Sequence, residues 1–157
     1  METRGLGITG LLVIGAALVL SGCGGNGSSS SGGGKSLTKE EFAAKANAIC
    51  ANYLLKTSAL PNTTNEAEAV KLMVDVRALY AKSIADMKKL EPPTVERATV
   101  DRALTLSEQQ LGTIDQEIAA MRKRDPAAVM KAVKRIKVIT KESNGIFNRL
   151  GAASCTR

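Results

Sequence analysis

The sequence predicts an all-α fold, an antiparallel up-down-up-down bundle of four helices over residues 36–157. From residue 36 onward, apolar residues recur at helical spacings of three and four, whereas the period-two alternation of strands is missing. Proline, asparagine and aspartate separate four such stretches, and short connections between helices favour antiparallel neighbours. The alternative arrangement is a three-helix core with the first helix docked loosely.

The first two helices are expected over residues 38–59 and 65–90. Thr38 and Glu41 have the spacing of a capping box, in which each side chain bonds the other residue's backbone N–H. Prolines follow both stretches and end them. The apolar faces comprise Phe42, Ala46, Ile49 and Tyr53 in the first helix, and Val70, Leu72, Met73, Val76, Leu79, Tyr80, Ile84, Met87 and Leu90 in the second.

The third and fourth helices are expected over residues 94–123 and 125–150. The apolar positions of the third helix step by four and three without a break, which is typical of a bundle seam. Asp125 followed by Pro126 marks the start of the fourth helix, and Gly151 is expected to cap its end. The seam of the third helix comprises Val100, Leu104, Ser107, Leu111, Ile114, Ile118 and Met121. The face of the fourth helix comprises Val129, Val133, Ile136, Ile139, Ser143, Ile146, Phe147 and Leu150.

The N-terminal residues 1–22 are typical of a signal peptide. The apolar run 6–20 would span roughly 22 Å as a helix, less than the ~30 Å hydrocarbon core of a bilayer. The segment Leu20-Ser21-Gly22-Cys23 that follows resembles the lipobox of bacterial lipoproteins. That resemblance implies transfer of a diacylglycerol to the Cys23 thiol, removal of the signal peptide before Cys23, and acylation of the new amine by a fatty acid such as palmitate. A plain secretory signal, or a short anchor with an incidental cysteine, is the alternative.

Residues 23–35 form a Gly/Ser-rich stretch that cannot bury apolar area, so we expect a flexible tether after the lipidated cysteine. Its r.m.s. reach is roughly 20 Å. The implied location is the extracytoplasmic face of the cell membrane, where the protein would be lipid-anchored.

The other two cysteines, Cys50 and Cys155, lie in the part expected to be exported, where thiols oxidise. The end of the fourth helix of a bundle lies beside the start of the first, so the tail can fold back toward Cys50. We therefore predict a structural disulfide between them. A redox-active pair is the rival interpretation, although no CxxC motif or histidine supports it.

The segments EEFAAKANAIC at 40–50 and GAASC at 151–155 resemble small helical lipoproteins and secreted proteins of actinobacteria. That family is largely uncharacterised. The resemblance implies location and fold, and it transfers no catalytic residue.

Basic residues concentrate in the fourth helix. The segment 122–149 has nine basic and two acidic residues. Its net charge is therefore +7, the same as that of the whole chain. One interpretation is contact with anionic lipid or an anionic cell-wall polymer; nucleic acid is disfavoured by the compartment. The other is a solvated face partly neutralised by Asp101, Glu108, Asp115 and Glu117 of the third helix. The candidate anion-binding residues are Lys131, Lys134, Arg135, Lys137 and Lys141.

The sequence offers no catalytic constellation, because histidine is absent and the folded part has no glycine-rich phosphate loop. We expect no metal, no cofactor and no enzymatic activity. Hydroxyls that interrupt the apolar seams at Ser107, Thr140 and Ser143 are expected to bond carbonyls of the preceding turn. Arg77 and Asp86 are expected at a solvated helix edge, the alternative being a buried pair with a ligand role.

The expected function is a non-catalytic binding or interaction module, a monomer whose partner is anionic lipid, a cell-wall polymer or an envelope protein. The alternative is a small-ligand carrier with an apolar cavity between helices, lined by Met73, Met87 and Met121.

Overall fold

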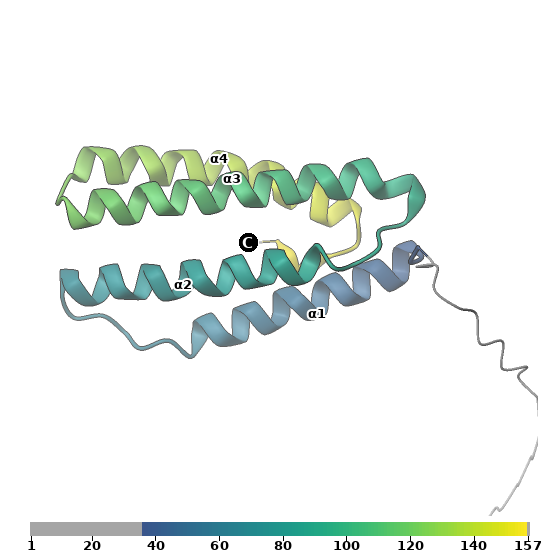
Figure 1. Ribbon diagram of the computed structural model, residues 1–157, viewed down its shortest axis with the longest axis horizontal. Helices are drawn as coiled ribbons and strands as arrows, with labels where there is room; N and C mark the ends of the chain where they lie inside the picture. Colours follow the sequence, from purple (N-terminus) through teal and green to yellow (C-terminus); the bar gives the residue numbers. More distant parts are fainter. Residues whose placement is uncertain (1–35, 157) are drawn as a thin grey trace, which may run out of the picture. The chain divides into compact units, whose positions relative to one another are not determined.

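The computed structural model describes residues 36–156 and shows only helices and turns in that range, so the predicted all-α class is confirmed (Figure 1). The predicted signal peptide 1–22, the lipidated Cys23 and the tether lie outside the described residues. The elements are α1 (Lys39–Ser58), α2 (Glu66–Met87), η1 (Thr94–Glu96), α3 (Arg97–Arg122), α4 (Pro126–Arg149) and η2 (Ala153–Cys155), where η denotes a short 3₁₀ turn.

Helices α1 and α4 start at the capping residues that the sequence predicts. The Thr38 hydroxyl accepts a hydrogen bond from the Glu41 amide at 3.2 Å, and the Glu41 carboxylate accepts one from the Thr38 amide at 2.8 Å. Asp125 caps α4 in the same way, accepting from the Ala128 amide at 3.0 Å. These bonds satisfy amides that have no partner within their own helix.

Two helix boundaries differ from the prediction. Helix α2 ends at Met87 rather than near residue 90, and α3 begins at Arg97 after the separate turn η1. Pro92 and Pro93 are both buried between these elements. A residue before proline is driven to an extended conformation, so the chain must leave α2 before it reaches this pair.

Helices that are consecutive in the sequence contact each other, and the contact between α3 and α4 is the most extensive. The short C-terminal turn η2 contacts both α1 and α4, while all four helices extend along the same long axis (Figure 1). The chain's end is therefore part of the packed structure and lies against the first helix.

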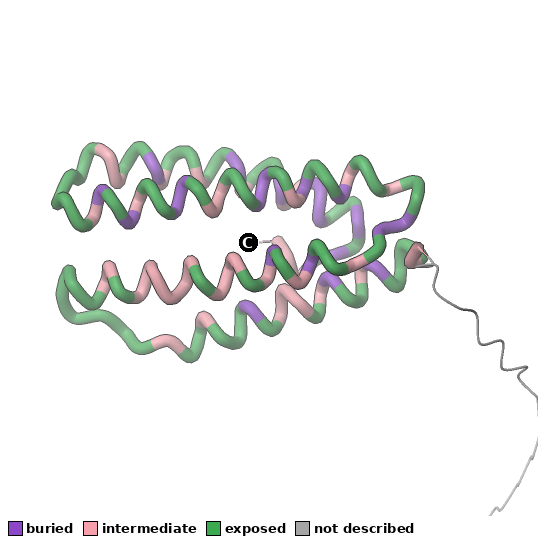
Figure 2. The backbone as a smooth tube through the Cα atoms, viewed as in Figure 1, coloured by how far each residue is buried: buried purple, intermediate pink, exposed green. Residues whose placement is uncertain are grey.

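The hydrophobic core is concentrated where η2 lies against α1. Figure 2 shows α2 mostly half-buried or exposed, and its only buried residues, Ile84 and Met87, are in its last turn and a half. On α3, Leu106 and Thr113 are only 2% exposed although the predicted seam omitted both. The core cluster comprises Phe42, Ala46, Met87, Val100, Ala103, Leu106, Ile139, Ile146, Phe147, Leu150 and Ala152.

No helix in the span 36–156 combines the length and the apolar character needed to cross a bilayer.

Candidate functional site

The basic face of α4, defined as Lys131, Lys134, Arg135, Lys137 and Lys141, is exposed to solvent at every position. The buried residues of this helix, such as Ile139 and Ile146, lie on its other side. Within the described residues, none of the five cations forms an ion pair. The face is therefore a run of like charges with no carboxylate of the described residues in ion-pair contact.

Two of the four acidic residues of α3 that could partly neutralise this face form ion pairs with cations outside it. Asp115 forms a two-pronged ion pair with Arg77 of α2, with Nε–Oδ1 and Nη2–Oδ2 distances of 2.8 and 3.0 Å. Glu108 pairs with Lys88, which immediately follows α2. These two carboxylates therefore bond cations of α2 and of the residue that follows it, and neither pairs with a cation of α4.

One ion pair does connect α3 and α4, but in it α3 supplies the cation and α4 supplies the carboxylate. Arg102 of α3 pairs with Glu142 of α4 at 2.6 Å. This pair engages the acid of α4 that stands next to Lys141 in the sequence. The charge of Glu142 is therefore offset by Arg102 of α3 and not by a lysine of the basic face.

The pKa directions agree with these pairings. The hydrogen bond from Arg77 holds the pKa of Asp115 below its ordinary value, and the same bond raises the pKa of Arg77. Desolvation by burial raises the pKa of Glu117, which has no cation partner in the described part. Arg77 does not pair with Asp86, since Asp86 accepts from Lys82 and Lys89 at a helix edge, as expected.

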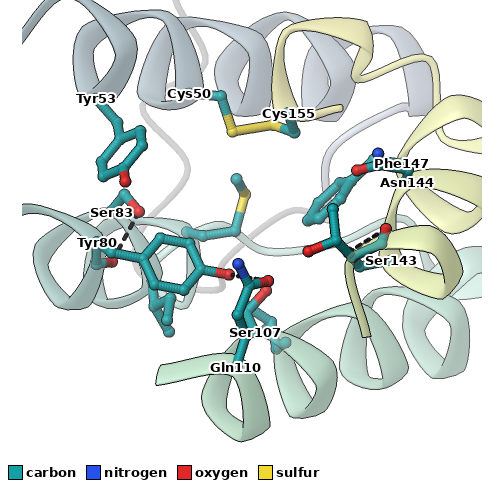
Figure 3. A pocket seen from close by; sticks show the side chains of 14 residues that line it. Cys50, Tyr53, Tyr80, Ser83, Ser107, Gln110, Ser143, Asn144, Phe147 and Cys155 are labelled. Carbon is teal, nitrogen blue, oxygen red and sulfur yellow. Dashed lines mark hydrogen bonds between the residues drawn. A yellow bond between two sulfur atoms is a disulfide. The ribbon is translucent and has the colours of Figure 1, made fainter. Parts of the chain in front are cut away.

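A narrow central cavity of about 40 Å³ lies among the four helices, bounded on one side by Cys50 and Cys155 (Figure 3). The Tyr80 hydroxyl donates to Gln110 Oε1 at 3.2 Å, and the rings of Tyr53 and Tyr80 meet edge to face at 5.7 Å. This volume fits about two or three water molecules. The lining is Cys50, Tyr53, Tyr80, Ser83, Ile84, Met87, Leu104, Ser107, Gln110, Thr140, Ser143, Asn144, Phe147 and Cys155, none of them charged.

The seam hydroxyls around this cavity bond the backbone of their own helices. Ser107 donates to the Ala103 carbonyl at 2.9 Å, and Ser143 donates to the Thr140 carbonyl at 3.1 Å, as predicted for both serines. The lining holds no histidine, carboxylate or amine next to either hydroxyl. The polar seam positions were the signal in the sequence that could have located this cavity.

The predicted pairing of Cys50 and Cys155 is present, with the sulfur atoms 2.04 Å apart and the Cα atoms 5.1 Å apart. Asn47, one turn before Cys50, binds the same tail twice. Its amide nitrogen donates to the Gly151 carbonyl at 3.1 Å, and its side-chain oxygen accepts from the Ser154 amide at 2.8 Å. Helix α1 therefore holds the C-terminus by one covalent link and two hydrogen bonds.

A larger groove of about 450 Å³ opens at the other end of the helices, between the start of α2 and the turn from α3 to α4. Sequence reasoning did not identify it. Met121 lines this groove and Met87 lines the central cavity, whereas Met73 lines neither, so the three methionines do not surround one cavity. The lining is Glu66, Ala69, Val70, Met121, Arg124, Asp125, Pro126, Val129 and Met130.

No group of three or more acidic, cysteine or histidine side chains suited to a metal ion is found in residues 36–156. Comparison of the chain with protein-family models, with curated proteins and with solved structures finds no match.

Proposed function

We propose that the chain is a lipid-anchored lipoprotein of the extracytoplasmic membrane face, and that its helical domain is a non-catalytic interaction module. The module binds a phosphate-bearing component of the cell envelope through the basic face of α4. The observation that carries this proposal is that the five cations of this face are exposed and that none forms an ion pair with an acidic residue among the described residues.

The topology belongs to the proposal as well. We infer that the four helices form an antiparallel up-down-up-down bundle, supported by the contacts between consecutive helices and the short connections between them. In this arrangement α4 has only α3 as an extensive helix neighbour, because η2 lies between α4 and α1. Its outer side is then free to meet a surface.

The location is supported by two separate features. The lipobox segment Leu20-Ser21-Gly22-Cys23 supplies the anchor, and the bond between Cys50 and Cys155 suits an oxidising compartment. A tether reaching roughly 20 Å would keep the domain within contact range of the lipid head groups. Each cation near an anionic surface contributes up to about 1 kcal/mol.

The test is binding of full-length protein, held in a neutral detergent, to soluble poly(glycerol phosphate) by isothermal titration calorimetry. Changing Lys134, Lys137 and Lys141 together to glutamate should weaken Kd by roughly a hundredfold or more, since three favourable charges become repulsive. The matched control changes Lys45, Lys56 and Lys71 to glutamate, which alters the net charge equally on α1 and α2.

The control should retain most of the affinity, and binding should weaken as salt rises. Equal loss in the two triple variants would mean that only net charge matters. That outcome, or no polymer binding by the unmodified protein, would refute the assignment to α4.

A further inference from the structure

The groove between α2 and the α3–α4 turn adjoins the first residues of the basic face. Met130, on the lip of the groove, is 55% exposed. From Met130, Lys134, Lys137 and Lys141 follow at spacings of four, three and four, so all lie along one line of α4. This line of side chains begins at the apolar groove and extends for about 16 Å along α4, and beyond Met130 its side chains are lysines.

The lining of the groove is mainly aliphatic. Six of the nine residues are apolar: Ala69, Val70, Met121, Pro126, Val129 and Met130. Its volume of about 450 Å³ lies within the range of small-molecule sites. No residue of α2 before Ile84 is buried, so this half of the domain does not close over the hollow.

The two carboxylates of the lining both have partners within the domain. Glu66 pairs with Arg124 at 3.0 Å across the gap between α2 and the α3–α4 turn. Asp125 accepts the hydrogen bond from the Ala128 amide that caps α4. The cations beyond the lip have no such partner, so charge complementarity favours an anionic head group on that side.

We propose that the groove takes up one acyl chain of an anionic membrane phospholipid, with the phosphate of the lipid on Lys134 and Lys137. This inference rests on the proposed function and makes it more specific, because it names a ligand with a chain as well as a phosphate. The chain removes apolar surface of Val70, Met121 and Val129 from water. The head group then meets the lysines one and two turns along α4 from Met130.

The experiment uses full-length protein in nanodiscs of phosphatidylcholine that contain a trace of a photoreactive lipid. One probe is phosphatidylglycerol with a diazirine in its acyl chain, and the other is phosphatidylcholine with the same chain. Cross-linked peptides are mapped by mass spectrometry. We expect the groove segments 69–70 and 121–130 to be labelled about tenfold more by the phosphatidylglycerol probe.

Two tryptophan variants of α2 separate the groove from its surroundings. Ala69→Trp fills the groove and should lower the labelling about tenfold. Ala67→Trp adds the same side chain at an exposed position two residues away and should leave it unchanged. Far-UV circular dichroism checks that both variants fold.

The outcomes distinguish this inference from the proposed function. Equal labelling by the two probes, or undiminished labelling of Ala69→Trp, overturns the acyl-chain site. If the groove segments are unlabelled while poly(glycerol phosphate) still binds through the lysines, the chain inference fails and the proposed function stands. If neither the polymer nor phosphatidylglycerol is bound, both fail.

Discussion

Removal of the bond between Cys50 and Cys155 should destabilise the domain without changing its fold. The two residues are 105 positions apart, so the bond closes a loop that includes almost the whole helical domain. The chain-entropy relation gives a contribution of about 4.8 kcal/mol for a loop of this length. Native strain and residual structure in the unfolded chain reduce such values, so we expect a loss of about 2–4 kcal/mol.

The structure also limits the loss of stability that removal of the disulfide causes. Both hydrogen bonds between Asn47 and the tail remain when the sulfurs are replaced, and Leu150 and Ala152 stay buried at 1% and 0% exposure. The end of the chain should therefore remain docked at low temperature. Its docking should become the weakest part of the domain when denaturant is added.

The assay is urea denaturation followed by circular dichroism at 222 nm. The full-length protein is compared with the double variant Cys50→Ser and Cys155→Ser, each with and without reducing agent. The reductant should destabilise the original protein to the level of the double variant and should not affect the variant. A midpoint of the original protein that is unchanged by reduction would refute the reasoning.

Two smaller perturbations test local features. Gly151 has a φ of +77°, so Gly151→Ala should lower the free energy of unfolding by about 1 kcal/mol in the same urea assay, because an L side chain is strained there; an unchanged midpoint would contradict this. Hydrogen bonds from Lys89 and Lys82 lower the pKa of Asp86 to about 2, below its ordinary 3.8. Its stabilising contribution is complete above pH 3.8 and is lost as the pH falls through about 2, so in thermal melts Asp86→Asn should reduce the difference in Tm between pH 5 and pH 2. An equal pH dependence in the variant would exclude Asp86 as a source of that acid sensitivity.

The starts of α1, α2 and α4 and the disulfide partners are the features that sequence reasoning predicted best. Thr38, Asn65 and Asp125 each accept a hydrogen bond from an amide three residues later. A cap of this kind depends only on residues within one turn, so the local sequence is enough to predict it. Cys50 and Cys155 are the only cysteines in residues 36–156, so their pairing needed only a fold that brings the C-terminal tail to α1.

The face that each helix buries could be predicted only in part. Leu104 and Leu111 belong to the unbroken seam of α3 but are half-buried, whereas Leu106, off that seam, is almost fully buried. Helix α3 packs against α2 on one side and more extensively against α4 on the other. The rotation of a helix between two neighbours follows from the sum of all its contacts, which a periodic pattern does not contain.

The sequence alone determined that the fold is helical, where α1, α2 and α4 begin, and that cations gather on the last of them, because each of these properties is local to a segment. Only the tertiary structure decided that Asp115 and Glu108 of α3 pair with Arg77 and Lys88 rather than with those cations. It also decided that the core gathers at one end and leaves the groove at the other. Both outcomes depend on the rotation and separation of helices far apart in the chain, and these follow from the packing of the whole domain.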